Sequence, residues 1–283
     1  MTQTGLSGWG RMGLALFFIH VLLLFLPPIP PDIKGSLWDY LSGYLAVAFL
    51  AVEFGRRRSS LAAWWATRSR RRQWAAGLGL ALATLGLVLA VRSLSPSLFA
   101  RFSREEGLWE PATLLCYLGS AILLLGTAGG LVGAERRHWR LIAALYVLMG
   151  LEEIDYFGIF GGMIGRVHGM YAGSLHDLIL LAVEGALSPT AWVLVAGLFL
   201  LMLVLLRWTG YLQPRAIVAM IGSFDFLWII IGLWFLLAAA AAEAGVFELA
   251  ARPPTLEEGL ELAGAICFFC YALAVAAGRY EPA

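Results

Sequence analysis

The stretch LIAALYVLMGLEEIDYFG, residues 141 to 158, decides how this chain folds. It begins as an apolar run after Arg140 and ends in three acids, Glu152, Glu153 and Asp155. At ~1.5 Å per residue, Glu152 would lie roughly 18 Å above Arg140 in a helix, within the outer leaflet of a membrane. Ionised carboxylates at that depth are costly unless they are paired, metal-bound or hydrated. The stretch therefore predicts a membrane helix whose acids face the bundle interior or a water-filled cavity.

The composition supports a membrane protein. Of the 283 residues, 60% are hydrophobic and 14% are charged, which is outside the range of ordinary soluble domains. The three cysteines, Cys116, Cys267 and Cys270, fall in apolar runs, so no disulfide framework is indicated. No nucleotide-binding, zinc-protease or nucleic-acid motif occurs in the sequence. We expect membrane lipids as partners and no nucleic acid.

About 20 mostly apolar residues are needed to cross the hydrocarbon core as a helix. By this measure the chain is an all-α polytopic bundle with about eight spans, in one integral membrane domain over residues 1–283. The expected spans are 11–28, 36–55, 74–94, 108–131, 140–160, 176–206, 216–244 and 256–278.

The arginines predict the orientation of these spans. Cytoplasmic loops are rich in Arg and Lys, and most cations fall in the connections after even-numbered spans and near the two chain ends. This pattern predicts a multi-pass protein of the bacterial inner (cytoplasmic) membrane with both termini cytoplasmic. Residues 56–73 form a basic, Trp-containing cytoplasmic segment, which is interpreted either as an interfacial helix that binds anionic lipids or as an inner loop.

Acids and one histidine open or close several spans on the predicted outer side. Glu152 and Asp155 share one helix face, and Glu153 is rotated by about 100° from Glu152. The other candidates open three further spans: Glu106 and Glu110, then His176 and Asp177, then Glu258 and Glu261. We therefore expect a shared polar pocket in the outer third of the membrane.

Such a pocket suits a divalent metal such as Zn, Mn or Fe, because carboxylate oxygens and an imidazole are suitable ligands. The candidate metal ligands are Glu110, Glu152, Glu153 and His176, and the candidate catalytic bases are Glu258 and Glu261. The alternative is that Glu106, Glu257 and Glu258 are acids stabilised by the dipoles of helix N-termini.

Four other signals have mainly structural interpretations. The CFFC sequence from Cys267 to Cys270 lies within an apolar span, which favours packing over redox chemistry. Glu135 and His138 have the spacing of a di-iron motif but are expected in a solvated turn. We interpret His20 as a hydrogen-bonded core residue. Asp225, expected near the midplane of its span, is either a proton relay or an interhelical hydrogen-bonding group.

Four motifs resemble those of a family of bacterial multi-pass membrane proteins with no established activity. They are REEGLWE (104–110), LEEIDYFG (151–158), SLHD (174–177) and LEEGLEL (256–262). The family pattern falls on Arg104, Glu106, Gly107, Glu110, Glu152, Glu153, Gly158, His176, Glu258 and Glu261. The chain departs from it at DYFGIFG, where the family has Trp-Gly-Gln-Arg, and at Asp177, where the family has Asn. The resemblance implies a polar site and no particular chemistry.

Three functions follow as hypotheses. The first is a membrane enzyme or binding protein whose outward-facing pocket holds a metal, with hydrolysis or transfer on a lipid-linked substrate as the reaction class. The second is an accessory structural subunit of a larger respiratory or photosynthetic membrane complex, with partner membrane subunits on its Trp-rich faces. The third is a proton-coupled transporter that uses Asp225 and the glutamates.

Overall fold

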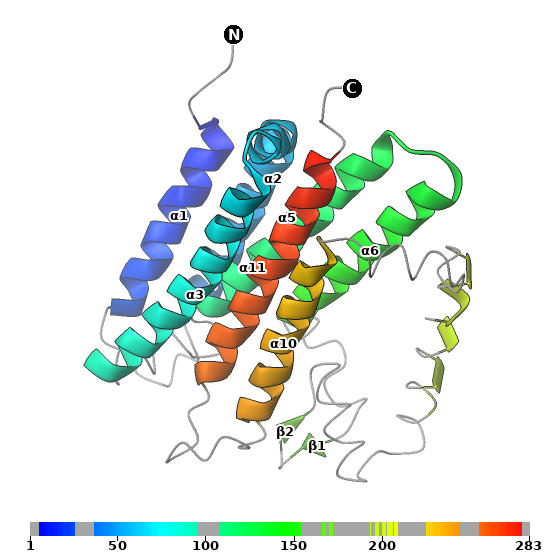
Figure 1. The fold of residues 1–283 in the computed structure, drawn as a ribbon. Coiled ribbons are helices and arrows are strands. Elements are labelled where there is room, and N and C mark those ends of the chain that lie inside the picture. The colour runs from blue at the N-terminus through cyan, green and yellow to red at the C-terminus, as the bar shows by residue number, and fades with distance from the viewer. Residues whose placement is uncertain are drawn as a thin grey trace.

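The computed structural model describes residues 6–25, 37–95, 108–153, 166–167, 170–171, 225–243 and 255–278, with single positions between 193 and 208. These residues form a helical bundle (Figure 1). Its helices are α1 (Gly8–Phe25), α2 (Leu37–Ala66), α3 (Arg70–Leu94), α5 (Trp109–Gly129), α6 (Gly133–Glu152), α10 (Phe226–Glu243) and α11 (Thr255–Ala277). A short antiparallel pair is formed by β1 (Arg166–Val167) and β2 (Met170–Tyr171).

The helices lie where the apolar stretches predicted them. Each expected span overlaps one of these helices except 176–206, most of which lies outside the described residues. Among the described residues, α3, α5 and α11 are long and apolar enough to cross a membrane. In addition, α1 and α10 contain shorter apolar stretches, residues 8–22 and 226–242. These are the features of a membrane protein.

Three helices extend further into basic sequence than the expected spans. Residues 56–66 continue α2 and residues 70–73 begin α3, so most of the basic segment 56–73 is helical and the connection covers only residues 67–69. Similarly, α6 begins at Gly133, not near residue 140. Arginine is a good helix former, and hydropathy measures only the preference for lipid over water, so hydropathy does not show how far a helix continues into basic sequence.

Helix α11 forms the centre of the bundle. It packs against α10, α5, α3 and α2. Of the residues in its apolar stretch 78% are buried, compared with 17% of those in the apolar stretch of α3. Cys267 and Cys270 are buried in this core, as the sequence predicted, and Phe268 lies beside them. The CFFC stretch is therefore part of the packing.

Small residues allow the helices around α11 to approach closely. A Cβ atom on Gly77 of α3 would lie 2.5 Å from the Trp228 ring and 2.6 Å from the Cys270 Sγ. On α10, a Cβ atom on Gly232 would lie 2.7 Å from the Phe268 ring. Glycines at such contacts let membrane helices pack through their backbones.

Each helix runs along the bundle in one of two opposite directions, so the helix ends fall into two groups. Figure 1 shows that α1 begins and α11 ends at the same end of the bundle, which is the upper end in that view. The end of α2 and the starts of α3 and α6 lie there too, and they carry arginines at 56–58, 70–72, 136, 137 and 140. We call this the arginine-rich end. The described glutamates Glu110, Glu152, Glu153, Glu258 and Glu261 lie toward the other end.

Candidate functional site: a glutamate cluster

Five glutamates from three helices lie at the end of the bundle opposite the arginine-rich end. Glu110 is in the first turn of α5, and Glu258 and Glu261 are in the first two turns of α11. Glu152 is the last residue of α6, and Glu153 follows it as the C-cap. Because α5 and α11 start at the end where α6 stops, the chain direction alone brings these residues to one level. We call these five residues the glutamate cluster.

Electrostatic interactions show that the glutamate cluster is close in space. The charged groups that act most strongly on the Glu153 carboxylate are Glu261, Glu258, Glu110 and Glu152. The interacting groups thus come from α5, α6 and α11. Within the cluster, the Oε2 atom of Glu258 is enclosed by protein. The five carboxylates therefore share one partly buried environment, in which their negative charges repel one another.

Two tyrosines that the sequence analysis did not select contribute to the same region. The Tyr44 hydroxyl, on α2, donates a hydrogen bond to the Glu110 Oε2 at 3.3 Å. Tyr117 of α5 is buried and interacts electrostatically with Glu153 and Glu261. Tyr117 lies seven residues after Glu110, two helical turns along the same face, and this spacing could have identified it. Tyr44 had no comparable signal, because its contact joins two helices.

A glycine positions the end of α6 against α5. A Cβ atom on Gly150 would lie 3.0 Å from the Leu114 Cδ1 and 3.5 Å from the Tyr117 Cβ. Gly150 is buried, and it precedes Glu152 by two residues. The close approach at Gly150 therefore sets how near Glu152 and Glu153 come to α5.

His20 is a buried core residue, as the sequence predicted. Its side chain is 1% exposed, and its Nδ1 lies 3.2 Å from the Ser42 Oγ. A Cβ atom on Gly43 would lie 3.1 Å from the His20 Cε1 and 3.2 Å from the Pro111 Cγ. His20 is thus close to the residue that follows Glu110, which places an imidazole near the glutamate cluster.

Of the other predicted site residues, the structure describes Asp225 alone, and it lies away from the glutamate cluster. Asp225 immediately precedes α10 and interacts with Tyr271, which is ten residues, or roughly 15 Å, along α11 from Glu261. Glu106, Asp155, His176 and Asp177 lie outside the described residues. Within the described ranges, no three or more His, Cys, Asp or Glu side chains form a group that could hold a metal ion.

The prediction of a solvated turn at Glu135 and His138 is wrong. Both residues are in the first two turns of α6, before its apolar stretch, because this arginine-containing sequence is helical. His138 is half-buried, with its ring centroid 4.5 Å from that of Trp139. This burial lowers the pKa of His138 to about 4.

No family model, curated protein or solved structure matches the chain. The resemblance to a bacterial membrane protein family therefore rests on the four sequence motifs alone.

Proposed function

We propose that this is a multi-span membrane protein that binds a divalent cation at the glutamate cluster. The position of Glu153, surrounded by four other glutamates, is the observation that supports the proposal. Close carboxylates in a partly buried place are unfavourable unless a cation or protons neutralise them. Zinc, manganese and iron suit a site of carboxylates and an imidazole, and His176 would supply the imidazole.

Proton binding is the second candidate, and it would fit a proton-coupled transporter. It is favoured because the described side chains do not already converge on one point as metal ligands do. Carboxylates that repel one another can share protons without a fixed coordination geometry. Asp225 lies apart from this group of carboxylates, since its neighbour Tyr271 is ten residues along α11 from Glu261.

Metal analysis of the detergent-purified protein separates the two candidates. We expect stoichiometric zinc, manganese or iron in the wild type and its loss in Glu153→Gln. Glu135→Gln is the matched control, because Glu135 lies at the other end of α6. If the wild type holds no metal and binds none on titration, the metal proposal is wrong. Proton uptake after a pH jump that is smaller in Glu153→Gln would then support the second candidate.

The proposed reaction class is metal-assisted hydrolysis or transfer on a lipid-linked or amphipathic substrate. It follows from the expected depth of the site near the lipid headgroups, where a bound metal could activate water. Glu258 and Glu261 lie three residues apart on α11 and are the proposed general bases. A Glu261→Gln variant that keeps its metal but loses turnover would support this role. Unchanged turnover would exclude it.

We also infer eight spans, with both termini on the cytoplasmic side of a bacterial inner membrane. The shared end of α1 and α11 and the arginines at that end support this orientation (Figure 1). A fluorescent protein fused after residue 283 should be fluorescent in cells, since it would fold in the cytoplasm. A fusion of alkaline phosphatase at the same position should be inactive. The opposite pair of results would reverse the orientation.

A further inference from the structure

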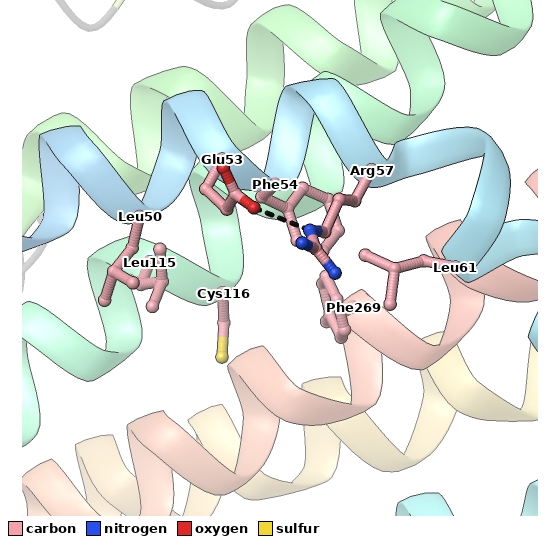
Figure 2. A pocket seen from close by; sticks show the side chains of 8 residues that line it. All are labelled: Leu50, Glu53, Phe54, Arg57, Leu61, Leu115, Cys116 and Phe269. Atoms are coloured by element: carbon pink, nitrogen blue, oxygen red, sulfur yellow. Dashed lines mark hydrogen bonds and ion pairs between the residues drawn. The ribbon is translucent and has the colours of Figure 1, made fainter. Parts of the chain in front are cut away.

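An apolar cavity of about 310 Å³ lies where α2, α5 and α11 meet. Leu50 and Leu61 of α2, Leu115 of α5 and Phe269 of α11 contribute to its walls, which are almost entirely carbon. Figure 2 shows one ion pair among the lining residues, in which the Arg57 Nε donates a hydrogen bond to the Glu53 Oε1 at 2.6 Å. Its volume is close to the lower limit for ligand-binding pockets, which is roughly 300 Å³. The cavity suits a single apolar chain.

A second cavity, of about 270 Å³, lies nearer the arginine-rich end of the same three helices. It has a mixed polar and apolar lining that includes Arg58 of α2 and Gly126 and Thr127 of α5. A Cβ atom on Gly126 would lie 2.7 Å from the Arg58 Nε and 2.8 Å from its Cδ. The absence of a side chain at Gly126 therefore allows the Arg58 side chain to lie against α5.

The two cavities are arranged like the two parts of a phospholipid. Arg57 and Arg58 are consecutive on α2, and one lines each cavity. On α2 the residues that line the apolar cavity run from Leu50 to Leu61, and Leu50 lies eight residues, or roughly 12 Å along the helix, from Arg58. The hydrocarbon half of a bilayer is about 15 Å thick. An acyl chain that runs along α2 from a headgroup near Arg58 would thus occupy one leaflet.

We propose that an anionic phospholipid binds across these two cavities, with its phosphate on Arg58 and one acyl chain in the apolar cavity. A guanidinium can donate two parallel hydrogen bonds to a phosphate. The neighbouring Arg56 and the arginines at 70–72 add positive charge at the same end, which attracts anionic lipid. The carbon-lined cavity favours a lipid over a free anion. This inference is independent of the glutamate cluster.

Native mass spectrometry of the full-length protein in detergent tests the proposal, with added phosphatidylglycerol or phosphatidylcholine of the same chain length. We expect the wild type to retain phosphatidylglycerol in preference to phosphatidylcholine. Gly126→Ala, which displaces Arg58 and leaves its charge, and Arg58→Gln should each lower retention about tenfold, the effect of one charge-assisted hydrogen bond. Gly129→Ala is the matched control, because a Cβ atom there meets nothing within 4 Å.

A second variant tests the acyl-chain part of the proposal separately from the phosphate part. Leu115→Trp, which fills the apolar cavity, should lower retention of phosphatidylglycerol without removing any charge. Helical circular dichroism and a single gel-filtration peak identify variants that are folded. Equal retention of the two lipids by the wild type, or equal effects of Gly126→Ala and Gly129→Ala, would overturn the proposal. Displacement of the lipid by millimolar inorganic phosphate would instead indicate a site for free anions and would also overturn it.

Discussion

Trp74 of α3 stacks on Trp228 of α10, with ring centroids 3.9 Å apart and an interplanar angle of 6°. The two rings join helices that are separated by about half of the chain. Trp228 is fully buried and also contacts the position where Gly77 lacks a side chain. The contact fixes α10 against α3 and the central helix α11.

The buried position of Trp228 predicts a large loss of stability in Trp228→Ala. Removal of a buried tryptophan leaves a cavity and lowers the free energy of unfolding by about 3 to 5 kcal/mol. Trp234 is the matched control on the same helix, because it is 68% exposed. Denaturant titration in detergent micelles should therefore show a far smaller change for Trp234→Ala. Equal changes in the two variants would contradict the packing at Trp228.

The glycines of α3 provide a second prediction. In Gly77→Ala the new methyl group would meet the Trp228 ring and the Cys270 Sγ, and relief of overlap in a packed core costs about 1 to 3 kcal/mol. Gly79 has nothing within 4 Å of a Cβ atom, so Gly79→Ala should be neutral or slightly stabilising through helix propensity. Thermal unfolding of both variants measures the difference. A loss of stability in Gly79→Ala as large as that in Gly77→Ala would show that the contact at Gly77 is not the cause.

Repulsion within the glutamate cluster predicts that Glu153→Gln stabilises the protein when metal has been removed. The substitution keeps the size of the side chain and removes one of five like charges, worth about 1 kcal/mol or more at short range. We expect a higher midpoint of thermal unfolding than in the wild type at pH 8 in a chelating buffer. At pH 5, where carboxylates take up protons, the difference should shrink. Glu135→Gln should show neither effect.

His138 should remain neutral down to unusually low pH. Its folded-state pKa of about 4 is below the ordinary value of 6.5 because burial disfavours the charged ring. As the pH falls from about 6.5 to about 4, the unfolded chain binds this proton before the folded protein does, so stability decreases over that window. NMR titration of the histidine rings, assigned with His138→Gln, should give a midpoint near 4. A midpoint near 6.5 would show that the ring is hydrated.

The sequence predicted which glutamates lie at the same end of the bundle, but not which residues of other helices contact them. The order and direction of the helices place the five residues of the glutamate cluster at the same end of the bundle. The lengths of the apolar stretches and the positions of the arginines indicate this order and direction. The contact of Tyr44 with Glu110 could not be predicted, because it depends on which face α2 presents to α5. The same holds for Arg58 against Gly126. His176 and Asp177 remain predictions, since they lie outside the described residues.

The sequence by itself determined which stretches form helices. Each backbone hydrogen bond of a helix joins residues four apart, and the apolar stretches are long enough to be recognised as membrane-crossing segments. Hydropathy did not show that α2 and α6 continue as helices into basic sequence, because arginine is unfavourable in lipid yet favourable in a helix. Only the tertiary structure decided that α11 is central and that Trp74 meets Trp228. Such choices depend on the fit between surfaces far apart in the chain, and no local pattern of residues encodes that fit.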